Sequence, residues 1–119
     1  MTAGASREQL ETMFTQMTDD AGWDVSQDLL WGYFFTHHTP LPLESAAAEL
    51  SKIGYEVANI YLSEKEDAAA PDLWWLHVER VEVHSVDSLL ARNAELVKFA
   101  AQQGLDAYDG MDVGPVGEQ

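Results

Sequence analysis

The sequence predicts an α+β protein in which a four-stranded antiparallel sheet carries two helices on one face. Two observations predict this fold class. Apolar residues alternate or run together over short segments that suit strands, and they recur every three to four positions over segments that suit helices. The order of these segments is one helix followed by strand–helix–strand–strand–helix–strand, which is the ferredoxin-like β-α-β-β-α-β order with an extra N-terminal helix. A length of 119 residues suits one domain, here taken as residues 1–119, and 46% hydrophobic residues suffice for a core.

Residues 1–28 are predicted to form a helical extension before the sheet. Ser6 and Gln9 have the spacing of a capping box, in which each side chain bonds the other residue's backbone N–H. Gly22 is expected to end the helix. The apolar positions at helical spacing are Leu10, Met13, Phe14 and Met17.

The aromatic and apolar segment 29–36 is predicted to be the first strand. Pro40 and Pro42 break it, and Pro42 also suits the first turn of a helix. That helix is expected to end at Gly54, in the position of a left-handed C-cap. A second strand follows over residues 55–62.

Residues 73–83 are predicted to form a long third strand. The alternation of its apolar residues slips near Glu79 and Arg80, and either a bulge or a poorly packed strand end would explain the slip.

The last helix is predicted to begin at a Ser85 cap and to end at Gly104. A final strand over residues 107–113 completes the sheet. Residues 114–119 are expected to form a frayed tail.

Both faces of the predicted sheet carry apolar groups. In the first strand, Trp31, Tyr33 and Phe35 share one face, and Leu30 and Phe34 share the other. Since the two core helices cover only one face, something else must cover the second. We expect the N-terminal helix to do so. A partner protein or a second copy of the chain is the alternative, which leaves a homodimer open.

The charge of the chain is strongly unbalanced, with 21 Asp and Glu against 6 Lys and Arg and a formal net charge of −15. This excludes direct nucleic-acid binding, since Lys and Arg supply most of the affinity for phosphates. It favours a basic protein segment as partner. Many acids lie in the loop before the third strand, and we expect this loop to be the docking edge, through Glu64, Glu66 and Asp67.

The composition narrows the cellular setting. There is no cysteine, which excludes disulfides and thiolate sites. The N-terminus does not read as a signal peptide, and no apolar run approaches the length of a membrane span. We therefore expect a cytoplasmic protein that does not enter the membrane.

No catalytic or cofactor-binding pattern stands out, so we expect no enzyme and no cofactor. The chain has neither a nucleophile elbow nor a phosphate-binding glycine loop. His37 and His38 are adjacent and would point to opposite faces of a strand, so no metal site is expected.

The aromatic residues suggest an alternative function. Trp31, Tyr33, Trp75 and His77 are candidates for a sheet face that binds a small apolar or aromatic ligand, or that forms an interface.

Two short motifs are distinctive: Gly54-Tyr55-Glu56-Val57, where a helix stop leads into a strand, and Tyr108-Asp109-Gly110-Met111 after the last helix. The second has the composition of a turn, in which Gly110 can adopt a positive φ. Taken with the aromatic first strand, these pieces resemble the RraB family, the regulators of ribonuclease activity B, from about Trp31 to Met111.

The resemblance implies a small acidic cytoplasmic protein without catalytic residues. It also implies inhibition of ribonuclease E through the enzyme's partly arginine-rich C-terminal scaffold region, and it makes Tyr108, Asp109 and Gly110 candidate partner-binding residues. The sequence departs from the family pattern at Met111, where the family tends to have Trp. It also lacks the strongly acidic tail of the better-known members.

Overall fold

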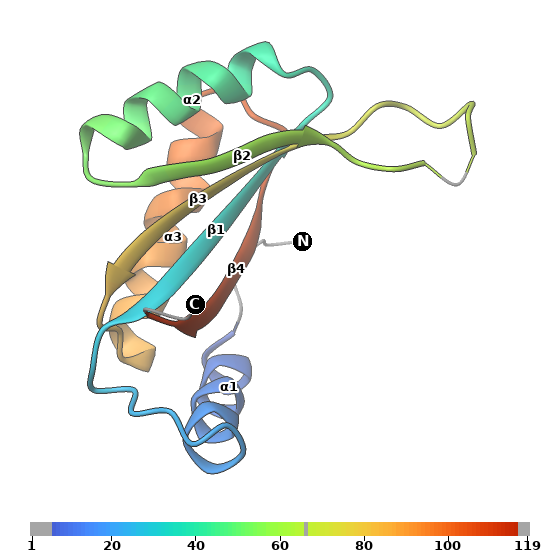
Figure 1. Ribbon diagram of the computed structural model, residues 1–119. Coiled ribbons are helices and arrows are strands. Elements are labelled where there is room, and N and C mark those ends of the chain that lie inside the picture. The colour runs from blue at the N-terminus through green and yellow to red at the C-terminus, as the bar shows by residue number, and fades with distance from the viewer. Residues whose placement is uncertain (1–5, 66, 117–119) are drawn as a thin grey trace.

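A four-stranded antiparallel sheet forms the centre of the computed structural model, which describes residues 6–65 and 67–116 (Figure 1). The strands are ordered β2-β3-β1-β4 and confirm the predicted ferredoxin-like α+β fold. In chain order the elements are α1 (Arg7–Asp19), β1 (Leu29–His37), α2 (Leu41–Lys52), β2 (Glu56–Leu62), β3 (Trp74–Glu82), α3 (Val86–Gln102) and β4 (Ala107–Pro115).

The hydrophobic core lies between the sheet and the helices, and β1 runs through its middle. Trp31 is 1% exposed, and Tyr33 and Phe35 are fully buried on the face of β1 that meets the helices. Phe35 packs against Phe99 of α3 and Tyr108 of β4, with ring centroids 5.9 and 5.2 Å apart. Burying these large rings removes much of the chain's apolar surface from water, which favours folding.

Helix α1 begins with the predicted capping box of Ser6 and Gln9. It does not cover the second face of the sheet, and that expectation was wrong. Its buried Leu10 joins the core, and Phe14 stacks on Trp31 at 6.1 Å. Because Trp31 belongs to the helix-facing side of β1, α1 extends the helix layer beyond the end of α3 (Figure 1).

Strand β3 shows no bulge at Glu79 and Arg80, so that explanation of the slip was wrong. Its register with β1 is continuous from Trp74 to Glu82. The alternation seemed to slip because Arg80 and Glu82 occupy helix-facing positions, where polar partners hold them.

The irregular positions lie in the two edge strands. Ala58 is the extra residue of β2, between Val57 and Asn59, and Asp109 is the extra residue of β4. Strand β4 also continues to Pro115, which pairs with Leu29, so the predicted tail begins later than expected. Residues 117–119 lie outside the described part of the chain.

Within the described residues, none of the helices combines the length and the apolar character that crossing a membrane requires.

Candidate partner-binding surface

The sheet face that points away from the helices, called here the open face, is organised in rows that cross the strands. In an antiparallel sheet, residues paired across strands project from the same face. One row, called the acidic row, runs through all four strands and consists of Glu56, Glu79, Gly32 and Asp112. The next row runs through Asn59, His77, Phe34 and Gly110, and a third through Tyr61, Trp75, Thr36 and Ala107.

Four rings on the open face form a continuous group, called here the aromatic strip: Tyr61, Trp75, Phe34 and His77. The Tyr61 and Trp75 rings are nearly parallel, 5° apart, with centroids 6.3 Å apart. Phe34 meets the edge of Trp75 at 6.2 Å and stacks on His77 at 4.3 Å. Tyr61 is 37% exposed and the other three rings are partly exposed, unlike the fully buried rings on the opposite face. The strip is therefore available for contacts outside the chain.

Gly32 in the acidic row is covered by side chains from the neighbouring strands. A Cβ atom there would clash with the Asp112 carboxylate and would lie 2.8 Å from Nε2 of His77. These two side chains therefore lean over the glycine from the neighbouring strands. Nε2 of His77 is buried and has no hydrogen-bond partner among the described residues, since the Glu79 carboxylate is 3.7 Å away.

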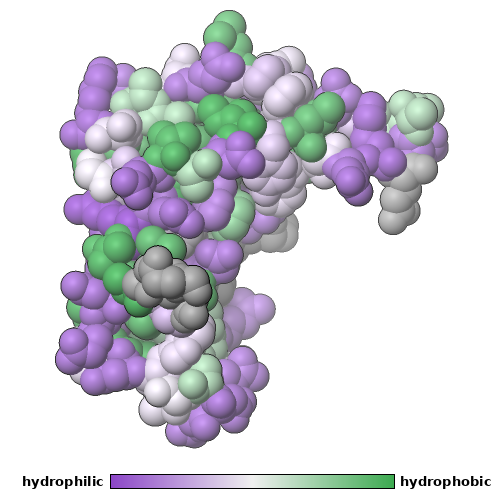
Figure 2. All heavy atoms as spheres, in the orientation of Figure 1, coloured by the Kyte–Doolittle hydropathy of each residue, from purple (hydrophilic) through white to green (hydrophobic). Residues whose placement is uncertain are grey.

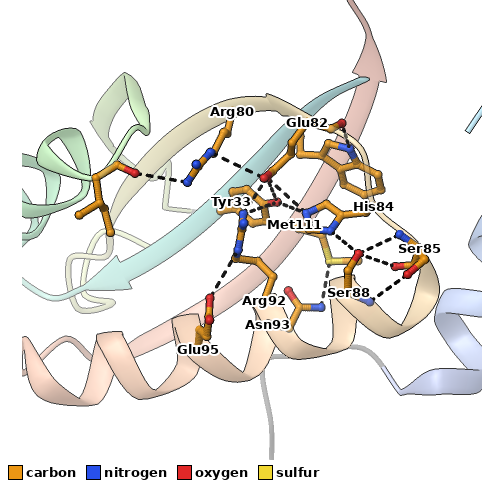
Figure 3. A network of polar contacts seen from close by, with 12 residues as sticks. Tyr33, Arg80, Glu82, His84, Ser85, Ser88, Arg92, Asn93, Glu95 and Met111 are labelled. Atoms are coloured by element: carbon orange, nitrogen blue, oxygen red, sulfur yellow. Dashed lines mark hydrogen bonds and ion pairs between the residues drawn. The ribbon is translucent and has the colours of Figure 1, made fainter. Parts of the chain in front are cut away.

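A polar network joins the end of β3 to α3 on the helix side of the sheet (Figure 3). The Glu82 carboxylate accepts hydrogen bonds from the Tyr33 hydroxyl at 2.6 Å and from the Arg92 guanidinium at 2.7 Å. His84 lies 3.3 Å from the same carboxylate and 3.0 Å from the Tyr33 hydroxyl. The indole of Trp31 donates to the Glu82 carbonyl at 3.1 Å. Because these groups satisfy one another, the network stabilises the fold.

The protonation states in this network follow from its contacts. Burial opposes ionisation of Glu82, but hydrogen bonds from His84, Arg92 and Tyr33 outweigh it and lower the pKa of the carboxyl to about 2. Burial also disfavours the Arg92 cation, yet its bond to Glu82 raises the pKa of the guanidinium. Burial, and then the bond to Glu82, raise the pKa of Tyr33, so its hydroxyl stays a donor.

The Tyr108-Asp109-Gly110 motif lies inside β4 and is a bulge rather than the expected turn. Tyr108 is buried, and its hydroxyl donates to the buried Asn93 at 2.6 Å. Asp109 is exposed, and Gly110 has the predicted positive φ, at 141°. Only Asp109 of the three thus presents a charged side chain to solvent.

The loop between β2 and β3, called here the arm, projects from the body of the molecule and is mostly hydrophilic (Figures 1 and 2). Glu64 and Asp67 are exposed on it, and Glu66 lies outside the described residues. The Lys65 ammonium pairs with Asp72 at 2.7 Å, and the Asp67 carboxylate accepts from the Ala69 backbone at 2.9 Å. Asp67, one of the acids that we expected to dock a partner, therefore also closes a turn within the arm.

The four residues suggested for a small-ligand face do not share a face, and this corrects their grouping. Tyr33 pairs with Val78, whereas His77 pairs with Phe34. Trp31 and Tyr33 therefore point into the helix layer, and Trp75 and His77 point to the open face. A shallow depression of 260 Å³ is lined by Leu30, Ser51, Gly54, Tyr55, Glu56, Glu79, Arg80 and Val81, and it includes none of the four.

His37 and His38 lie on the same side of Asp106, not on opposite faces as expected, because His38 follows the end of β1. Their Nδ1 atoms are 3.3 and 3.0 Å from the Asp106 carboxylate, and the three side chains offer ligand atoms within 4.8 Å of one another. However, Nδ1 of His37 accepts the Asp106 backbone N–H at 3.0 Å. The bond to His38 lowers the pKa of Asp106. The contacts hold the loop before β4 against the end of β1.

A comparison with protein families matches residues 7–113 to RraB, regulator of ribonuclease activity B. This covers almost the whole chain, including α1. The chain belongs to the RraB family. No curated protein matches it.

The acidic row is the feature of this RraB-family chain that sequence reasoning missed. The sequence alone could have placed Glu79 on the same face as Trp75 and His77, because alternate residues of a strand point to the same side. Its neighbours Glu56, Gly32 and Asp112 come from three other strands, and their alignment depends on pairing registers that bulges shift. No local pattern carries that information.

Proposed function

We propose that this RraB-family chain regulates a ribonuclease as a non-catalytic partner, by binding a basic segment of the enzyme. The observation that carries the proposal is that most Lys and Arg side chains are already paired with carboxylates of the same chain. Five of the six Lys and Arg side chains form ion pairs within the chain. The carboxylates in excess of them give the net charge of −15 and attract basic segments.

The same charge explains how a protein without catalytic machinery can regulate RNA cleavage. A basic segment of a ribonuclease binds RNA through its phosphates. An acidic protein that covers this segment competes with RNA for the same cations. The family resemblance suggests the arginine-rich part of the ribonuclease E scaffold region as the segment.

The test is the cleavage rate of a fluorogenic RNA by ribonuclease E with increasing amounts of the protein. Full-length ribonuclease E is expected to slow down, whereas a truncated enzyme without its C-terminal region keeps its rate. Inhibition should weaken steeply between low and moderate salt, because the encounter is electrostatic. If the full-length enzyme keeps its rate, or both enzymes slow equally, the proposal is wrong.

An RNA mobility-shift assay with the protein alone serves as the control. We expect no shift, because the chain would have to approach phosphates with an excess of like charge. A shift would mean that the protein binds RNA directly, and it would contradict regulation by competition for the basic segment of the enzyme.

A further inference from the structure

Among the described residues, no Lys or Arg forms an ion pair with the carboxylates of the acidic row. Arg80 lines the same depression as Glu56 and Glu79 but is paired with Glu82. Glu56 and Glu79 are directly paired across β2 and β3, and like charges in that position destabilise a sheet. Asp112 lies in the same row on the far side of Gly32. The six Lys and Arg residues all lie elsewhere, on the helices, on the arm or on the helix-facing side of β3. A cation supplied from outside would therefore be stabilised here.

The aromatic strip lies beside the acidic row and suits one kind of cation better than another. A guanidinium is planar and weakly hydrated, so it stacks on aromatic rings and also bonds carboxylates in pairs. An ammonium is a compact, strongly hydrated charge and gains less from stacking. The parallel rings of Tyr61 and Trp75 and the carboxylates of Glu79 and Asp112 thus favour arginine over lysine.

The spacing of the rows fits an extended chain. Successive rows are two residues apart along β1 and β3, or roughly 7 Å. This is also the distance between alternate side chains of an extended peptide. A peptide lying along β3 would place one side chain at Glu79 and the alternate ones near His77 and Trp75.

The geometry points to the open face as the docking site for an arginine-rich segment of a partner protein. The inference rests on the proposed function, which supplies the basic character of the partner. It adds which surface of the chain binds the partner and that arginine is the preferred cation. The docking residues are the acidic row and the aromatic strip, and the arm contributes long-range attraction.

The test measures binding of a fluorescein-labelled peptide of alternating arginine and serine by fluorescence anisotropy, at low and moderate salt. A lysine–serine peptide is the matched ligand. The double variant Glu79→Gln with Asp112→Asn removes two charges from the open face. The control variant Glu8→Gln with Glu11→Gln removes two from exposed positions of α1.

We expect the open-face variant to bind the arginine peptide about tenfold more weakly than the unmodified protein, and the control variant to lose about twofold at most. The open-face variant should melt at the same temperature or higher, because it loses the repulsion between Glu56 and Glu79. Trp75→Leu should reduce the preference for the arginine peptide over the lysine peptide.

Equal weakening by both double variants would overturn the docking site and leave the proposed function standing. If the unmodified protein binds neither peptide at either salt concentration, the proposed function fails and the docking site with it. A doubled mass in light scattering that the open-face variant abolishes would assign the face to a second copy of the chain and overturn the inference.

Discussion

The carboxylate of Glu82 and the guanidinium of Arg92 lie 2.7 Å apart and tie the end of β3 to α3. The Glu82 side chain is 14% exposed, so removing its charge leaves the Arg92 cation poorly compensated. We expect Glu82→Gln to lower the free energy of unfolding by about 2–3 kcal/mol at pH 7. Urea denaturation measures it. Glu95→Gln is the control, because Glu95 is also near Arg92, at 3.6 Å, but is 73% exposed, and it should cost little.

The same carboxylate predicts a pH dependence of stability. Since the pKa of Glu82 falls from an ordinary value of 4.5 to about 2 on folding, the stabilisation is complete above about pH 4.5. It is lost as the pH falls toward 2. The difference in unfolding free energy between the unmodified protein and Glu82→Gln should therefore shrink over this range. A difference that stays constant from pH 5 to pH 2 would show that Glu82 does not ionise as described.

The hydrogen bond between Tyr108 and Asn93 predicts a second stability effect. Tyr108→Phe keeps the ring against Phe35 but leaves the buried Asn93 oxygen without its donor. We expect a loss of about 1–2 kcal/mol in unfolding free energy. Tyr61→Phe provides the comparison, because the Tyr61 hydroxyl belongs to a partly exposed residue of the open face. Similar losses in both variants would contradict a special role for the buried bond.

The order and type of the elements were readable from the sequence because they depend on local patterns. The Ser6 and Ser85 caps and the positive φ of Gly54 and Gly104 are formed by residues close in sequence, and all appear in the structure. The family resemblance was likewise carried by short motifs, and the family match confirms it.

Predictions that depended on long-range pairing fared worse. Trp31 and Trp75 looked alike in sequence, yet they occupy opposite faces of the sheet, since the register decides which residues meet. The strand seemed to break near Glu79 and Arg80, because the groups that hold Arg80 and Glu82 on the helix side, the Ile53 carbonyl and Arg92, come from other elements. The position of α1 was likewise decided by its contact with Trp31, which no pattern within α1 reveals.

Leu10 tests whether α1 is part of the core. Its side chain is fully buried, so Leu10→Ala should lower the free energy of unfolding by about 2–4 kcal/mol. Leu41→Ala, at a residue that is 69% exposed, should cost little. Denaturation followed by tryptophan fluorescence is suitable, because Trp31 contacts Phe14 of α1. If Leu10→Ala and Leu41→Ala lower the free energy of unfolding by equally small amounts, α1 is not part of the core.

A substitution at Gly32 tests how closely Asp112 and His77 pack over the glycine on the open face. Gly32→Ala places a methyl group against Asp112 and His77, so both side chains must move and His77 is pushed from its stack on Phe34. Because these are the ends of side chains, we expect a moderate loss of about 1 kcal/mol in unfolding free energy, together with shifted NMR signals of the His77 ring.

Gly114→Ala is the matched control, since a Cβ there meets nothing within 4 Å. It should leave stability and the His77 signals unchanged. Adding Asp112→Ala to Gly32→Ala should restore part of the loss, because it removes one of the two clashing groups. If Gly32→Ala behaves like Gly114→Ala, His77 and Asp112 do not converge over the glycine, and the arrangement of these two side chains on the docking surface is not as described.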